Sequence, residues 1–180
     1  MASSASSSSK VLEGGCLCEA VRYKISFPKD HDLSKDSLGC ICQCTQCRKQ
    51  TGSFFLASLT VPISAIEWQG NSEDKIKRYR KSENIARGFC GHCGSFLFWH
   101  RDGGNICVAT GSLDPLYLIG QGVEDNKSGV PSDGFAKEIF SGHFKVEFCE
   151  SEIKGVTDDM PILHKGKRCQ GDNSIPILEG

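Results

Sequence analysis

Hydrophobic and polar residues alternate along several short stretches of this chain. In the clearest case every second residue is apolar, over the segment Val21-Arg22-Tyr23-Lys24-Ile25-Ser26-Phe27. A period of two is typical of a β-strand that buries one of its faces. Similar short runs predict further strands at residues 54–61, 75–79, 85–89, 96–99, 106–109 and 140–148.

Glycine-rich or polar segments separate the predicted strands. They lie at residues 70–72, 91–94 and 101–104 and contain the residue types that form turns. No long segment keeps the helical period of 3.6 residues. The pattern therefore predicts a mainly β protein built from antiparallel sheets. At 180 residues, the chain is long enough for one sizeable hydrophobic core, so we expect a single domain.

The two ends of the chain lack this alternation. Residues 1–10 are small and polar and are predicted to form a disordered, serine-rich tail. The folded domain is expected to occupy residues 11–156. Residues 157–180 are expected to form a C-terminal extension that is free or lies on the domain surface, and Cys169 within it is expected to be exposed.

Charge and hydropathy limit the classes of partner. The 21 Lys and Arg residues nearly balance the 22 Asp and Glu residues, so no overall field attracts nucleic acid or an anionic membrane. No apolar stretch approaches the roughly 20 residues that cross a bilayer, and no apolar signal sequence follows Met1. We therefore expect a soluble protein with a small-molecule ligand. The sequence is compatible with either a monomer or a homo-oligomer.

The eleven cysteines are the most unusual feature of the composition. An odd number cannot pair completely into disulfides within one chain, and the Cys-x-Cys and Cys-x-x-Cys spacings suit metal binding better than disulfides. Without a signal sequence, the pattern favours thiolates on zinc in the reducing cytoplasm over a disulfide-rich secreted protein.

Four cysteines lie within eight residues, at Cys40, Cys42, Cys44 and Cys47. A tetrahedral zinc with bonds near 2.3 Å needs sulfur atoms about 3.8 Å apart, and Cys42, Cys44 and Cys47 can meet this requirement with one turn. An extended strand from Cys40 to Cys44 spans roughly 13 Å, which places Cys40 beside the site on the face of Cys42. Three ligands would leave the zinc open for chemistry, whereas binding by Cys40 would close it.

Two further pairs, Cys16 and Cys18 with Cys90 and Cys93, predict a second zinc site. Each pair lies in a glycine-flanked turn, so two distant strands would each supply two thiolates to a closed, structural site. His92 lies between two of the predicted ligands. It could replace one of them, but is expected to face solvent.

Four motifs together resemble a known family. GGCLCEAVRY, CQCTQCRKQTGS, RGFCGHCGSFLFW and ATGSLD occur here in the order and spacing of the glutathione-dependent formaldehyde-activating enzyme (Gfa) family, which also contains centromere protein V. The resemblance is clear over residues 12–114. It implies a β-tent fold and two zinc ions, one structural and one catalytic, divided among the seven cysteines as above. It also implies glutathione as the thiol partner.

Two features depart from the family pattern. Cys40 is an additional thiol, and Glu138-Ile139-Phe140 stands where the family has His-Ile-Phe. The second departure concerns substrate identity, since this part of the fold can line the pocket.

The expected function is that of a zinc-dependent carbon–sulfur lyase. Cys42, Cys44 and Cys47 would hold the catalytic zinc, and the substrate would be S-hydroxymethylglutathione or a related biosynthetic thiol adduct. Candidate contacts to glutathione lie within the cysteine cluster and directly after it. Arg48 and Lys49 are the expected partners for the carboxylates of glutathione. The alternative is that both are ordinary surface charges. The complete set of predicted contacts is Gln46, Arg48, Lys49, Thr51 and Ser53.

Two other functions compete with this prediction. A non-catalytic, zinc-stabilised binding module would need the metal sites only for folding. Peptide methionine sulfoxide reduction would need a lone catalytic cysteine and gives no reason for the cluster at residues 40–47.

Overall fold

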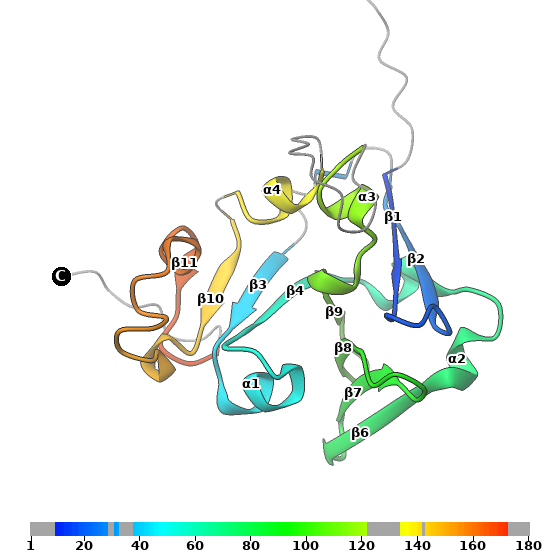
Figure 1. Cartoon of the computed structure of the whole chain (residues 1–180), viewed down its shortest axis with the longest axis horizontal. Coiled ribbons are helices and arrows are strands. Elements are labelled where there is room, and N and C mark those ends of the chain that lie inside the picture. The colour runs from blue at the N-terminus through cyan, green and yellow to red at the C-terminus, as the bar shows by residue number, and fades with distance from the viewer. Residues whose placement is uncertain (1–9, 29–30, 33–37, 122–133, 142, 173–180) are drawn as a thin grey trace, which may run out of the picture.

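The chain folds around two β-sheets. The computed structural model describes residues 10–28, 31–32, 38–121, 134–141 and 143–172. The smaller sheet is antiparallel and has the strand order β1-β2-β5 (Figure 1). Its strands are β1 (Val11–Gly15), β2 (Arg22–Ser26) and β5 (Ile66–Trp68).

The larger sheet has eight strands in the order β11-β10-β3-β4-β9-β8-β7-β6. From β3 to β6 all neighbours are antiparallel, as predicted. The prediction is wrong at the other edge, where β3, β10 and β11 pair in parallel. The strands are β3 (Leu38–Cys42), β4 (Leu56–Val61), β6 (Ile76–Ser82), β7 (Ile85–Cys90), β8 (Phe96–Arg101), β9 (Ile106–Ala109), β10 (Lys145–Glu147) and β11 (Lys167–Arg168).

The described helices are short. They are α1 (Thr45–Thr51), α2 (Ser72–Lys75), α3 (Pro115–Leu118) and α4 (Ala136–Ile139), with 3₁₀ turns between strands. Within the described residues, no helix has the length and apolar character needed to cross a membrane. The fold is therefore mainly β, as the alternation predicted.

The main hydrophobic core lies between the two sheets. Leu12 and Ile25 of the smaller sheet and Leu97 of the larger one are completely buried there. Trp68 contacts the ring of Tyr23 on one side and that of Phe98 on the other, at centroid distances of 5.8 and 5.5 Å. These aromatic contacts join the sheets and add to the stabilisation from burial alone.

Alternation located most of the long strands. The predicted stretches at residues 54–61, 75–79, 85–89, 96–99 and 106–109 each overlap an observed strand. The prediction at residues 140–148 is wrong over its first half, because only Lys145–Glu147 forms a strand. The pattern missed β1, β3 and α1, which are too short or too rich in glycine and cysteine to show a clear period.

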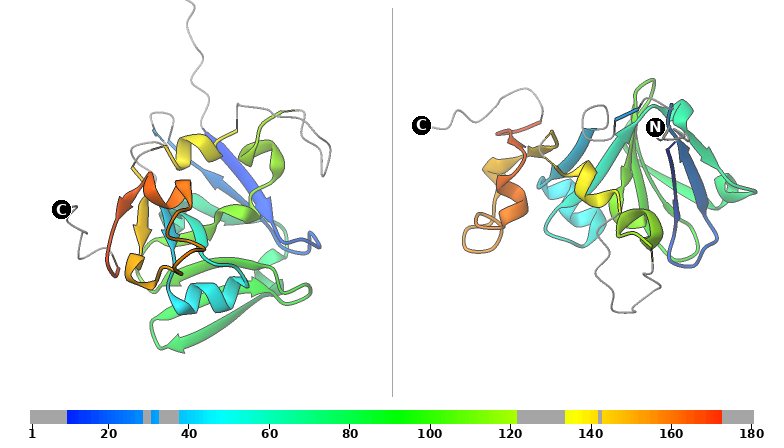
Figure 2. Two further views of the ribbon diagram at one scale, coloured as in Figure 1. Left: turned by 60° about the vertical axis from the view of Figure 1, so that its left-hand side comes forward. Right: turned by 90° about the horizontal axis from the view of Figure 1, so that it is seen from above.

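The described part of the C-terminal segment is built into the fold. Leu163 is 0% exposed and packs with Phe144 and Val146 in a second core beside β3. Cys169 is only 1% exposed, so the expectation that it is exposed is wrong. It is buried because β11 pairs with β10 and extends the sheet, at the edge opposite β6 (Figure 2).

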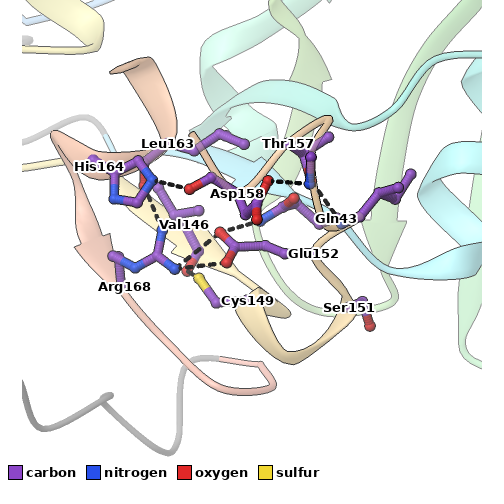
Figure 3. A network of polar contacts seen from close by, with 12 residues as sticks. Gln43, Val146, Cys149, Ser151, Glu152, Thr157, Asp158, Leu163, His164 and Arg168 are labelled. Atoms are coloured by element: carbon purple, nitrogen blue, oxygen red, sulfur yellow. Dashed lines mark hydrogen bonds and ion pairs between the residues drawn. The ribbon is translucent and has the colours of Figure 1, made fainter. Parts of the chain in front are cut away.

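A polar network fixes this segment to the cysteine-rich loop (Figure 3). Glu152 accepts a hydrogen bond from Arg168 at 2.9 Å and a longer one, 3.4 Å, from the buried side chain of Gln43. Arg168 also donates to the Leu163 carbonyl at 3.0 Å. Because Gln43 lies between Cys42 and Cys44, the network connects the C-terminal segment to the loop that carries these thiols.

The burial of Leu163 gives a test of this integration. Leu163→Ala should lower the free energy of unfolding by about 2–5 kcal/mol, because a buried leucine leaves a cavity when it is truncated. The adjacent Ile162 is 38% exposed and serves as the matched control. Ile162→Ala should change the free energy by less than about 1 kcal/mol. Urea unfolding measures both, and equal effects would show that the segment is not part of the core.

Candidate metal centres and their surroundings

The first group of four cysteines joins the two sheets. Cys16 and Cys18 lie in the turn that follows β1, and Cys90 and Cys93 lie at the end of β7 and in the turn before β8. Their four Sγ atoms all lie within 4.8 Å of one another. The distance from Cys18 Sγ is 3.6 Å to Cys16 Sγ and 3.8 Å to Cys90 Sγ. The structure thus brings together the four residues that the spacing predicted.

The local backbone shapes both turns for this arrangement. Gly94 has φ of 77°, a conformation that glycine adopts without strain, and its N–H donates to the Cys90 carbonyl. The backbone N–H groups of Val21 and His92 donate to the sulfurs of Cys16 and Cys90, at 3.3 and 3.4 Å. The His92 side chain is exposed and lies outside the cysteine group, as expected.

The second group consists of Cys42, Cys44 and Cys47, whose Sγ atoms also lie within 4.8 Å of one another. Cys42 ends β3, Cys44 is the N-cap of α1, and Cys47 lies in the first turn of that helix. The cap holds the turn closed, because the Cys47 N–H donates to Cys44 Sγ at 3.4 Å. Apolar side chains surround the group, namely Leu56, Phe96, Ala109 and Phe148.

Cys40 lies beside the second group but is not part of it. It is two residues before Cys42 on β3, so both side chains project from the same face of the strand. Its sulfur is not among the three that converge. Burial and the negative charge of Glu147 raise the pKa of the Cys40 thiol well above its usual value. Cys40 therefore packs beside the group as a neutral thiol.

The three converging thiols share their charge unequally. Hydrogen bonds from Cys42 and Cys47 lower the pKa of Cys44 to about 2, whereas the hydrogen bonds of Cys42 with Cys44 and Cys47 raise the pKa of Cys42 far above its usual range. Cys44 is therefore the first of the three thiols to ionise. A cation among the three sulfurs would stabilise all of them as thiolates.

The residues predicted to contact glutathione are mostly engaged within the protein. Arg48 donates to the carbonyls of Phe54 and Ser151, at 2.8 and 2.6 Å. The Thr51 hydroxyl donates to the Cys47 carbonyl at 2.8 Å. Lys49 and Ser53 are exposed. Arg48 and Thr51 thus brace the loop around the second group.

Two charged residues near the second group were missed by the sequence analysis. Arg87 of β7 donates to Gln46 at 2.6 Å, and its positive charge acts on the thiol of Cys47. Glu147 of β10 lies beside Cys40, and burial raises the pKa of its carboxyl. Both are charged residues within short strands, and a charge at such a position is the signal that could have identified them. Their distance from the cluster along the chain hid the connection.

Of three comparisons with known proteins, one identifies a family. The glutathione-dependent formaldehyde-activating enzyme family matches residues 11–126, well over half of the chain, and this range contains all seven grouped cysteines. A search of curated proteins gave no match. Among solved structures, the chain is similar to a Rhodobacter sphaeroides protein studied in structural genomics. The two share 20% identity over 66% of this chain and 97% of the other, with a TM-score of 0.45. On the family match, the chain belongs to the glutathione-dependent formaldehyde-activating enzyme family.

Proposed function

We propose that the chain binds two zinc ions, one in each cysteine group. Sulfur atoms around a tetrahedral zinc are about 3.8 Å apart. The measured separations of 3.6 and 3.8 Å in the first group fit this value, and the second group is similarly compact. All eleven cysteines are free thiols, which suits a reducing compartment such as the cytoplasm.

The first zinc has a structural role. Four thiolates complete its tetrahedral coordination, so it has no position for a substrate. It joins the β1–β2 turn to the β7–β8 turn, whose cysteines are 72 residues apart at Cys18 and Cys90. In this proposal the domain is a β-tent, with the two sheets held together at this point.

The second zinc has a catalytic role. Three converging thiolates leave one coordination position, and Cys40 is not placed to fill it. A zinc ion bound there would lower the pKa of an incoming thiol and hold its sulfur as thiolate. The convergence of three cysteines rather than four is the observation that carries the proposed function.

The proposed reaction makes or breaks one carbon–sulfur bond. In the forming direction, the sulfur of glutathione bonds to the carbonyl carbon of formaldehyde, and the thiol proton ends on the carbonyl oxygen, giving S-hydroxymethylglutathione. In the lyase direction, the same bond breaks and the two components are released. A related thiol adduct would react in the same way. No oxidant or reductant is needed.

The residues around the second group prepare the site for this reaction. Leu56, Phe96, Ala109 and Phe148 limit the access of water, which strengthens electrostatic interactions there. Arg48 and Thr51 hold the loop that carries Cys44 and Cys47. A non-catalytic binding module would need the metal sites only for folding, and it gives no role to an open coordination position at the second group.

Metal content tests the division of the cysteines. Full-length protein reconstituted with zinc should contain two ions per chain. Cys44→Ser should retain one ion and the folded sheets, because it removes a ligand only from the second group. Native mass spectrometry measures the stoichiometry, and circular dichroism measures the fold.

Cys40→Ser is the matched control for this experiment. It removes a thiol from β3, four residues before Cys44, and should keep both ions. Loss of the second zinc in Cys40→Ser would indicate a closed site with four thiolates, and would contradict an open position for the substrate.

Two measurements test the proposed catalysis. The zinc protein should accelerate exchange between glutathione and S-hydroxymethylglutathione, observed by NMR exchange spectroscopy, and Cys44→Ser should lose this acceleration. In cobalt-substituted protein, glutathione should change the visible absorption of one of the two ions. Two ions that do not respond to the thiol, together with no acceleration, would favour the non-catalytic binding module.

A further inference from the structure

Arg87 projects from the face of the large sheet that carries the second cysteine group. Its neighbours Ala86 and Gly88 are buried, and Ala86 is only 1% exposed, whereas Arg87 is half-buried. Successive side chains of a strand point to opposite faces, so Arg87 faces away from the core between the sheets. Its guanidinium reaches Gln46 of α1 at 2.6 Å.

The guanidinium keeps most of its hydrogen-bonding capacity. It has five N–H donors, and within the described residues it forms one side-chain hydrogen bond, to Gln46, and no ion pair. Its register partners are Tyr79 of β6 and Trp99 of β8. Directly paired residues share one face of a sheet, so two aromatic side chains flank Arg87.

Arg87 also differs from the cations nearest to the cluster in sequence. Arg48 is occupied by two backbone carbonyls, and Lys49 is exposed. By contrast, Arg87 donates to Gln46, the residue directly before Cys47, although 40 positions separate Arg87 from Cys47 along the chain. Arg87 is thus a half-buried cation with unused donors beside the three converging thiols.

We propose that Arg87 binds a carboxylate of the thiol substrate and makes the second cysteine group selective for thiols that carry a carboxylate. This inference rests on the proposed function of that group. A guanidinium binds a carboxylate through two parallel hydrogen bonds. Gln46 fixes one side of the guanidinium through Nη2, and the remaining N–H groups form no side-chain hydrogen bond within the described residues. The sulfur would then lie at the cysteines while the carboxylate lies at β7.

Comparison of a charged and an uncharged thiol tests this selectivity. In zinc-loaded Arg87→Met, the KM for glutathione should rise about 10- to 100-fold, as expected for a lost hydrogen bond to a charged group, with a smaller change in kcat. In the cobalt-substituted variant, the apparent Kd for glutathione should rise by a similar factor. The Kd for 2-mercaptoethanol, which has no carboxylate, should change less than about twofold. Arg87→Lys should restore part of the affinity for glutathione, because it keeps the charge.

Two variants separate recognition from a structural role. Arg101→Met removes a positive charge from an exposed position on the adjacent strand and should leave both thiols unaffected. Gln46→Ala removes the internal partner of Arg87 and should weaken glutathione less than Arg87→Met does. Equal weakening of both thiols in Arg87→Met, or an equal effect in Gln46→Ala, would overturn the inference. If neither thiol perturbs the wild-type cobalt protein, the proposed function itself is wrong.

Discussion

The convergence of Cys16 and Cys18 with Cys90 and Cys93 is the constraint on which the rest of the structure depends. These residues end or follow strands of different sheets, so their meeting fixes the sheets against each other. The same contact holds the β7–β8 hairpin, and β7 carries Arg87 towards α1. A second link acts on the smaller sheet, where Arg22 donates two hydrogen bonds to Asp114. The second cysteine group, which is the candidate reactive site, is separate from both of these contacts. Substitutions in it are therefore expected to leave the junction between the two sheets intact.

Sequence alternation predicted strands where burial is one-sided and failed where the environment is different. β7 follows the period of two because one face contacts the core and the other does not. β3 reads Leu-Gly-Cys-Ile-Cys, and its successive residues Ile41 and Cys42 are both buried, so both faces of the strand are covered. Its parallel pairing with β10 joins residues about 100 positions apart, and no local signal encodes this. The burial of Cys169 depends on a second parallel pairing, that of β10 with β11.

The second cysteine group was predictable because its geometry is local, whereas its charged surroundings were not. A single turn determines how Cys42, Cys44 and Cys47 converge, so spacing alone was sufficient. Arg48 was a natural choice for a ligand contact because it follows Cys47, but helix α1 directs it to the carbonyls of Phe54 and Ser151. Arg87 reaches this helix from the distant strand β7, where it donates to Gln46. The residues next to the cysteines in the sequence and the residues next to them in the structure are therefore not the same.

The contrast between the two groups follows from how the chain supplies the sulfurs. Two turns that face each other contribute two thiols each, so the first group surrounds its centre completely. The second group comes from one continuous segment, which can approach from one side only. A fourth sulfur from that segment would have to be Cys40, but the extended backbone of β3 carries it away from the turn. It is held there by pairing with β4 and β10. An open side is thus a consequence of strand geometry, and apolar residues and Arg87 lie around it.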